Sequence, residues 1–318
     1  MQSALVTGGA GFIGSNLVRA LVASGEKVRV LDDMSTGSVE NLASVNGSVE
    51  LVEGDLRDPY TVRRAVSGIQ VVYHLGAIPS VARSVADPRT SHAVNVNGAL
   101  NVLMAARDEE VRRIVFASSS SVYGDTQILP KHEGMPVAPT SPYAAGKLAG
   151  EGCMQSFAAT YGMETISLRF FNVFGPNQNP ASEYAAVVPR FMSRMLSGAP
   201  PLIFGDGFQS RDFTFVANVV QACLLAADAG PEAIGQVVNV GCGTRTSLLD
   251  LVETMNQLLG TELRPGHLDP RPGDVRDSQA DVSKAQQVIG YRPLVSLREG
   301  LRRTIDWMAE RRAAVGAG

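Results

Sequence analysis

The stretch ALVTGGAGFIG, at positions 4–14, decides the fold. Its first half is an unbroken apolar run that predicts a buried strand, and a helical pattern follows directly over 13–24. The glycines between them fit two spacings: G-x-G-x-x-G at Gly9, Gly11 and Gly14, and G-x-x-G-x-x-G at Gly8, Gly11 and Gly14. A turn without Cβ atoms lets backbone N–H groups approach a pyrophosphate at the positive end of a helix. The stretch therefore predicts a dinucleotide site.

Strands and helices alternate beyond this turn. Apolar runs at 27–32, 49–55, 71–77, 113–119 and 165–171 predict further strands, separated by helical patterns at 59–67, 90–107 and 143–160. Apolar strands separated by helices are typical of a parallel sheet covered on both faces. The predicted fold class is α/β, a Rossmann-type doubly wound parallel sheet with ligands at the carboxyl ends of its strands.

The second half of the chain is less regular. Loops rich in Pro, Gly and Asn, at 175–182, 205–212 and 264–274, separate helical segments at 184–197, 216–228, 247–259 and 296–311. We expect a smaller C-terminal α/β lid that binds substrate, with the region around 212–242 returning to extend the sheet. The predicted division is a dinucleotide domain of 1–171 plus about 212–242, and a substrate domain of 172–211 and 243–318.

Composition excludes several classes of protein. The 318 residues are 45% hydrophobic and 19% charged, enough for a sizeable core. A net charge of −3 without any Lys/Arg-rich run argues against a nucleic-acid partner. The first strand begins almost at once and no apolar run reaches membrane length, so we expect a soluble, cytoplasmic protein. Three distant cysteines suit a reducing compartment, and four scattered histidines predict no metal site.

The acidic residues at strand ends indicate which dinucleotide binds. Asp32 ends the second strand, 18 residues beyond Gly14, where a carboxylate accepts hydrogen bonds from ribose hydroxyls. It would also repel a 2′-phosphate, and Asp33 follows it, so NAD is favoured over NADP. Asp55 and Leu56 close the third strand and are expected to bracket the adenine.

Tyr143 and Lys147 form the expected catalytic pair. Their i,i+4 spacing at the start of a predicted helix places both side chains on one face. Tyrosine has a pKa of about 10 when unperturbed. A nearby ammonium and the positive nicotinamide ring would lower that pKa and favour the phenolate. The serine run at 118–121 ends the preceding strand, where its hydroxyls can lie between the phenol and a substrate hydroxyl.

The chain resembles the nucleotide-sugar epimerase/dehydratase branch of the extended short-chain dehydrogenases/reductases. Within that branch it is most similar to the UDP-hexose and UDP-N-acetylhexosamine 4-epimerases. The resemblance spans essentially the whole chain. It is carried by GGAGFIG (8–14), SSSSVYG (118–124), SPYAAGK (141–147), RFFNVFGP (169–176), RDF (211–213) and RPGDVR (271–276).

The resemblance implies an NAD-dependent UDP-sugar 4-epimerase. Such an enzyme interconverts gluco and galacto configurations, in UDP-GlcNAc/UDP-GalNAc, UDP-Glc/UDP-Gal or both, through a transient 4-keto intermediate. Tyr143 would remove the proton of the C4 hydroxyl while hydride passes from C4 to NAD. Lys147 would bind the nicotinamide ribose and lower the pKa of Tyr143, and Ser119 would polarise the sugar O4. NAD would stay bound throughout. The full set of residues expected at the cofactor is Gly8, Gly11, Phe12, Ile13, Gly14, Asp32, Asp33, Ser35, Thr36, Gly37, Asp55, Leu56, Leu75, Gly76, Ala77, Tyr143 and Lys147.

Other positions match the family's substrate contacts. Asn172 would hold the sugar or its diphosphate, Arg211 and Arg271 would clamp the pyrophosphate, and Asp274 would bind the uridine ribose. Small side chains would leave room for an N-acetyl group. The full expected set is Ser80, Ser119, Ser120, Tyr143, Asn172, Ala186, Val187, Arg211, Arg271, Asp274 and Ser278. Pro79 stands where related acetyl-accepting enzymes can have glycine, which leaves the preferred sugar open.

Four alternatives remain beside this interpretation. Nucleotide-sugar dehydratases of the superfamily carry Thr-Asp-Glu where this chain has Ser119-Ser120-Ser121, so elimination is disfavoured, and decarboxylases belong to the same lyase group. UDP-glucuronate 4-epimerases tend to carry Thr at the position of Asn172. An NAD-sensing protein would usually lack the tyrosine–lysine pair. A net oxidoreductase would release NADH.

The resemblance also implies a homodimer, formed through the helices at 90–107 and 143–160.

Overall fold

The computed structural model describes residues 2–179, 186–270 and 275–316, with side chains described up to Arg312. Its centre is a parallel sheet in the order β11-β6-β5-β4-β1-β2-β3. The strands are β1 (Ser3–Thr7), β2 (Lys27–Asp32), β3 (Val49–Glu53), β4 (Val71–His74), β5 (Arg113–Ser119), β6 (Glu164–Phe170) and β11 (Gln236–Val240). The order reverses between β1 and β4, the switch point at which doubly wound sheets bind ligands. The predicted strands and fold class are confirmed, and β11 extends the sheet from within 212–242.

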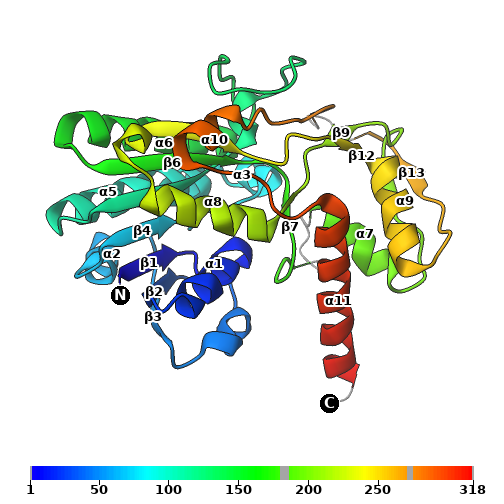
Figure 1. Ribbon diagram of the computed structural model, residues 1–318, viewed down its shortest axis with the longest axis horizontal. Coiled ribbons are helices and arrows are strands. Elements are labelled where there is room, and N and C mark those ends of the chain that lie inside the picture. Colours follow the sequence, from blue (N-terminus) through cyan, green and yellow to red (C-terminus); the bar gives the residue numbers. More distant parts are fainter. Residues whose placement is uncertain (1, 180–185, 271–274, 317–318) are drawn as a thin grey trace.

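Helices cover both faces of this sheet (Figure 1). One face carries α1 (Phe12–Ala23) and α8 (Val216–Asp228), and the other carries α2 (Pro59–Val66), α5 (Gly98–Asp108) and α6 (Pro142–Tyr161). Successive residues of a strand point to opposite faces. Accordingly Ala4 and Val6 belong to the first core cluster and Leu5 to the second.

The helical pattern at 90–107 is interrupted, contrary to the prediction of one helix. Here α4 (Pro88–His92) passes into a π-helical turn, η2 (Ala93–Asn97), before α5 begins, and an unpredicted α3 (Val81–Ala86) precedes them. The wide turn carries Asn95, whose side chain accepts a hydrogen bond from Ile78 N at 2.8 Å and donates one to Ile78 O at 3.3 Å. A π-turn of this kind is a common feature of functional sites. In this chain it fixes the loop that follows β4.

The second half of the chain forms a group of helices and short strands at one side of the sheet (Figure 1). Its helices are α7 (Val187–Met195), α9 (Leu248–Leu259) and α11 (Leu297–Gly316), and α10 (Ser283–Ile289) packs near β11. Three strand pairs accompany them: β7 (Val173–Phe174) with β10 (Thr214–Phe215), β8 (Leu202–Phe204) with β13 (Gly266–Leu268), and β9 (Ser210–Arg211) with β12 (Thr246–Ser247). No helix in the described ranges is both long and apolar enough to cross a lipid bilayer.

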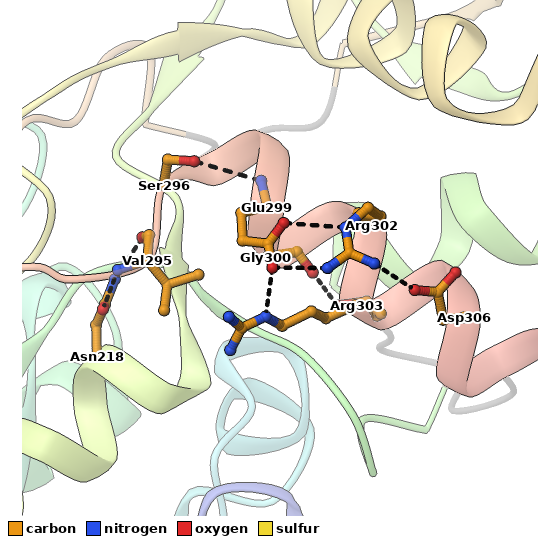
Figure 2. Close-up of polar contacts among 9 residues, drawn as sticks. Asn218, Val295, Ser296, Glu299, Gly300, Arg302, Arg303 and Asp306 are labelled. Carbon is orange, nitrogen blue, oxygen red and sulfur yellow. Dashed lines mark hydrogen bonds and ion pairs between the residues drawn. The ribbon is translucent and has the colours of Figure 1, made fainter.

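The start of α11 is fixed to α8 by Asn218 (Figure 2). The Asn218 side chain accepts from Val295 N at 2.9 Å and donates to Val295 O at 2.8 Å. Along the exposed face of the helix, Glu299 pairs with Arg302 and Arg303, as Figure 2 shows. These exposed pairs contribute little to stability, so the buried face of α11 provides most of its attachment.

Candidate active site

The turn after β1 has no room for a side chain at Gly8 or Gly14. Gly8 has φ +67°, and its N–H donates to Leu31 O at 2.8 Å. A Cβ on Gly14 would lie 2.1 Å from Gly8 O, and one on Gly8 would lie 2.8 Å from the Cα of Gly76. At the start of α1, the cap residue Gly11 places no side chain over the first N–H groups. This cradle therefore fits the diphosphate of a dinucleotide.

Asp32 shapes the same turn. Its buried carboxylate accepts hydrogen bonds from Ala10 N at 2.9 Å and from Met34 N at 3.0 Å. Burial raises the pKa of Asp32, and the two backbone donors oppose that rise. A Cβ on Gly37 would lie 2.8 Å from the Asp32 carboxylate. Asp32, the residue expected to bind the adenosine ribose, thus also holds together the loops at Ala10 and Met34. The spacing of residues in the sequence did not indicate this second role.

The ends of β1, β3 and β4 meet beside this turn. Thr7 Oγ1 accepts from Gly76 N at 3.0 Å, and a Cβ on Gly76 would lie 2.8 Å from the Leu56 side chain. Arg57 holds Asp55 through hydrogen bonds that lower the pKa of the Asp55 carboxyl. Other members of the expected cofactor set are partly or fully exposed: Phe12, Ile13, Asp33, Ser35, Thr36, Leu75 and Ala77.

Helix α6 holds Tyr143 and Lys147 one turn apart. Ser141 caps the helix by accepting from Ala144 N at 3.2 Å, and Tyr143 N donates to Ser84 Oγ at 3.0 Å. The ammonium of the buried Lys147 donates to the carbonyl of Ala117, at the end of β5, at 2.7 Å. The helix start and the strand end therefore position the pair together.

Burial governs the charge state of this pair. It lowers the pKa of Lys147 to about 8, although the Glu151 carboxylate opposes that shift. It raises the pKa of Tyr143, which a hydrogen bond from Ser119 lowers in part. In the protein without NAD, loss of solvent outweighs what the Ser119 hydroxyl supplies, so the pKa of Tyr143 is raised. The predicted fall of this pKa toward neutrality also depends on the charge of the nicotinamide ring and stays a prediction for the NAD-bound protein.

His74 lies beside the lysine. Its Nδ1 is 2.7 Å from Thr7 Oγ1, and its ring stacks on Phe116 with centroids 5.7 Å apart. The Lys147 ammonium lies 5.1 Å from the centroid of the same phenylalanine ring. Burial, followed by the charge of Lys147, lowers the pKa of His74 to about 3, so the imidazole is neutral at neutral pH.

The four serines after β5 have different partners. Ser119 Oγ accepts from Ser121 N at 3.2 Å and from Ser121 Oγ at 2.9 Å, which caps the short turn η3 (Ser120–Tyr123). Ser118 points inward and donates to the Glu151 carboxylate. Of the run, Ser119 is the serine whose hydroxyl lowers the pKa of Tyr143.

A buried ion pair lies behind the lysine. Arg169 donates to both oxygens of Glu151 at 2.8 Å, and its guanidinium lies 4.7 Å from the ring centroid of Tyr123. Sequence reasoning missed Glu151, although its spacing of four residues after Lys147 places it on the same helix face. The pair joins α6 to β6 at the level of the catalytic residues.

A cleft of about 270 Å³ brings together four of the expected substrate residues: Asn172, Ala186, Val187 and Arg211. It also contains Phe204 and Gln209, which sequence reasoning missed. Gln209 Nε2 donates to Phe204 O at 2.6 Å, while its buried Oε1 has no hydrogen-bond partner in the described ranges. The cleft thus offers an aromatic ring and an amide acceptor side by side.

Three further expected substrate residues, Ser80, Ser120 and Ser278, are not among the described residues that line this cleft. Ser80 caps α3 by accepting from Arg83 N at 3.2 Å, and Ser120 lies partly exposed in η3. Ser278 is buried beside β9, where its N–H donates to Ser210 O at 3.1 Å. Arg271 and Asp274 lie outside the described residues.

Asp212 stands between two residues that line the cleft, Arg211 and Phe213. Its buried carboxylate accepts from the N–H groups of Cys242, Gly243 and Ala280 at 2.8–3.0 Å. Burial raises the pKa of Asp212 to about 6. Asn172 Nδ2 donates to Asp212 O at 3.2 Å. This network sets the place of Asn172 and of the adjoining Arg211.

The loop after β7 is joined directly to helix α1. Asn177 Nδ2 donates to Ser15 Oγ at 2.9 Å, and Asn16 Nδ2 donates to Pro176 O at 2.9 Å. Both bonds connect the loop after β7 to α1. Among the residues that the structure describes, no cluster of three His, Cys, Asp or Glu side chains could hold a metal ion.

Comparisons with known proteins match this arrangement. The model of the NAD dependent epimerase/dehydratase family matches residues 4–241. The UDP-glucose 4-epimerase of Mycolicibacterium smegmatis is 43% identical over 307 residues, 95% of this chain and 97% of that protein.

Two solved structures are also closely similar. The UDP-N-acetylglucosamine 4-epimerase from Methanobrevibacter ruminantium superimposes with a TM-score of 0.93 at 37% identity, over 98% of this chain and 99% of the other. The UDP-glucose 4-epimerase of Thermotoga maritima, solved with UDP-glucose, gives a TM-score of 0.93 at 37% identity, over 98% and 100%.

Proposed function

The chain belongs to the NAD-dependent epimerase/dehydratase family, and from that premise we propose that it is a UDP-sugar 4-epimerase. The observation that carries the proposal is the placement of Tyr143, Lys147 and Ser119 beside a glycine cradle, with serine and no carboxylate at positions 119–121. Elimination needs an acid and a base of its own, whereas inversion at C4 needs a single group that takes up and returns one proton.

The residues that would hold NAD are those of the cradle. The N–H groups at the start of α1 bind the diphosphate, Asp32 accepts from the adenosine ribose, and Lys147 donates to the nicotinamide ribose. When bound, NAD would act as the hydride acceptor for C4 of the sugar and as the donor that returns the hydride to the opposite face.

Tyr143 carries the proton. Its phenolate oxygen accepts the proton of the C4 hydroxyl and later gives it back, while Ser119 Oγ orients the sugar oxygen. Because burial raises the pKa of Tyr143, ionisation depends on positive charge brought close to the ring. Lys147 is the cation that this chain places one helical turn away.

The cleft would bind the nucleotide. The Phe204 ring, which has the Arg190 guanidinium 5.2 Å from its centroid, can stack on a planar base with its other face. Gln209 Oε1, which has no hydrogen-bond partner among the described residues, can accept from an N–H of that base. Arg211 lies on the same wall and suits the diphosphate, whose oxygens match the forked donors of a guanidinium. Arg271 and Asp274 keep the diphosphate and ribose roles that the family resemblance implies.

The sugar is expected to be hexose or N-acetylhexosamine. Ala186 and Val187 place small side chains on one wall of the cleft, which leaves room for the sugar substituent.

We further propose that 1–171 with 212–242 binds NAD and that the rest of the chain binds the substrate. Helices α5 and α6 are proposed to pair in a cytoplasmic homodimer, since α5 exposes Leu100 and Met104 one turn apart.

The test is turnover by the protein as purified, without added NAD. UDP-N-acetylglucosamine and UDP-glucose are supplied separately, and the anomeric proton signals are followed by NMR. The proposal expects the matching galacto epimer from at least one of the two. A 4-keto-6-deoxy product would make the protein a dehydratase, and release of one NADH per sugar would make it a net oxidoreductase.

A further inference from the structure

Lys131 is a buried lysine for which the proposed mechanism has no use. Only 2% of the residue is exposed. Its ammonium has one hydrogen-bond acceptor in the described ranges, the carbonyl of Gly124, at the long distance of 3.4 Å. No ion pair joins it to a carboxylate among those residues. An ammonium buried in this way is costly unless an anion accompanies it.

The backbone of Lys131 is fixed next to expected substrate positions. Lys131 N donates to Gln279 O at 2.8 Å, and Lys131 O accepts from Asp281 N at 2.8 Å. These bonds tie it to the segment that follows Ser278. Its acceptor Gly124 closes the turn that begins at the serine run. Lys131 therefore connects the turn after the serine run with the segment that follows Ser278, an expected substrate residue.

Lys131 lies near one cation and one exposed carboxylate. Burial lowers the pKa of Lys131, and the nearby Arg211 guanidinium lowers it further. Asp125 opposes the shift, but it is exposed and forms no hydrogen bond with the ammonium. Arg211 is thus close enough to Lys131 to act on its charge, and an anion bound at the Lys131 ammonium would offset both this repulsion and the loss of solvent.

We propose that Lys131 is a substrate-binding residue whose ammonium donates to an anionic oxygen of the bound nucleotide sugar. The proposal rests on the proposed function and deepens it. Two groups carry such oxygens: the diphosphate, present in every UDP-sugar, and the carboxylate, present only in UDP-uronic acids such as UDP-glucuronate and its C4 epimer. A contact with the diphosphate would make Lys131 strengthen the binding of every UDP-sugar. A contact with the carboxylate would make it favour UDP-uronic acids over other UDP-sugars.

The test compares Lys131→Met and Lys131→Gln with a matched control, Lys27→Met, whose side chain is exposed at the start of β2. All are studied as NAD-loaded full-length protein. Calorimetry gives the Kd of UDP. NMR gives KM and kcat for UDP-glucose, UDP-N-acetylglucosamine and UDP-glucuronate. Thermal unfolding is measured without nucleotide.

If Lys131 contacts the diphosphate, both variants weaken UDP binding and raise every KM about tenfold or more, the loss expected for a hydrogen bond to a charged group. If it contacts a uronate carboxylate, only the KM for UDP-glucuronate rises. In both cases the unfolding midpoint without nucleotide is unchanged or higher, because a buried charge has been removed. Lys27→Met changes none of these quantities.

A different set of results would overturn the proposal. Unchanged Kd and KM values in both variants would do so. A fall of the unfolding midpoint, or failure of both variants to fold, would assign Lys131 a structural role instead. If wild type turned over none of the three sugars, the proposed function would fail separately, and the Kd of UDP in wild type and variants would still decide the role of Lys131.

Discussion

The ammonium of Lys147 is held by the carbonyl of Ala117 at 2.7 Å, a bond that joins helix α6 to the end of β5. The next residue, Ser118, donates to Glu151 one helical turn beyond the lysine. Two consecutive residues of the strand thus hold the helix at two points. The lysine is therefore placed by the protein itself, before any ligand contacts it.

Tyr143→Phe removes the proposed base and leaves the ring. We expect kcat to fall by about 10²–10⁴-fold with bound NAD retained, since that is the usual contribution of a positioned proton-transfer group. The matched control is Tyr161→Phe at the exposed end of the same helix. Epimerisation followed by NMR is the measurement, and equal rates in the two variants would remove Tyr143 from the mechanism.

Ser119→Ala should shift the pH dependence of kcat/KM. The Ser119 hydroxyl lowers the pKa of Tyr143, so its removal raises that pKa and the phenolate forms at higher pH. The rising limb of the pH profile therefore moves to higher pH, and activity at neutral pH drops. A variant that is slower at every pH with an unmoved limb would show that Ser119 acts only on the sugar.

His74 should make the protein acid-sensitive. Its pKa is lowered from 6.5 to about 3 in the folded state, so below pH 6.5 the unfolded chain takes up a proton that the folded chain refuses. Stability is full above that pH and falls as the pH drops, by about 2 kcal/mol near pH 5. Denaturant unfolding of wild type and His74→Asn at several pH values measures it. If the unfolding free energies of the two proteins fell in parallel with pH, His74 would not be the source of the acid sensitivity.

Two glycines should respond in opposite ways to alanine. In Gly14→Ala the new Cβ meets the Gly8 carbonyl at 2.1 Å, so the turn must move, and we expect loss of bound NAD and a lower unfolding midpoint. Gly152, on α6, has nothing within 4 Å of a new Cβ. Gly152→Ala should therefore stabilise the helix by about 0.5–1 kcal/mol. The measurements are the NAD content, determined after acid extraction, and the midpoint of thermal unfolding of each variant. A Gly14→Ala protein that keeps its NAD would contradict the role of the glycine turn in binding the diphosphate.

Glu151→Gln should destabilise the fold strongly. It leaves Arg169 charged and buried without its partner, a change that typically costs about 3–5 kcal/mol. The comparison is Glu299→Gln, which removes an acid from the exposed network of Figure 2 and should leave the unfolding midpoint close to wild type. Similar losses of unfolding free energy in the two variants would mean that the buried pair stabilises the fold no more than the exposed one.

Much of the sheet could be predicted because each strand is an apolar run between glycine-rich or acidic turns. The predicted bounds of 27–32 and 113–119 coincide with β2 and β5. The interruption at 93–97 could not be predicted, because it depends on the contact between Asn95 and Ile78, which exists only after the loop following β4 has folded.

The cleft was predicted only in part. Asn172 and Arg211 stand in motifs that sequence reasoning can identify. Phe204 and Gln209 do not, since β8 is three residues long and its partner β13 begins more than sixty residues later. The raised pKa of Tyr143 in the protein without NAD was not predicted, because burial has no direct signal in a sequence.

The central claim is that one sugar carbon gives up its hydrogen and receives the same hydrogen back on its other face. The most direct measurement uses UDP-glucose labelled with deuterium at C4, incubated with the purified protein in ordinary water and analysed by NMR. We predict UDP-galactose that carries the deuterium at C4. Product with hydrogen at C4, or deuterium recovered in free NADH, would contradict the account.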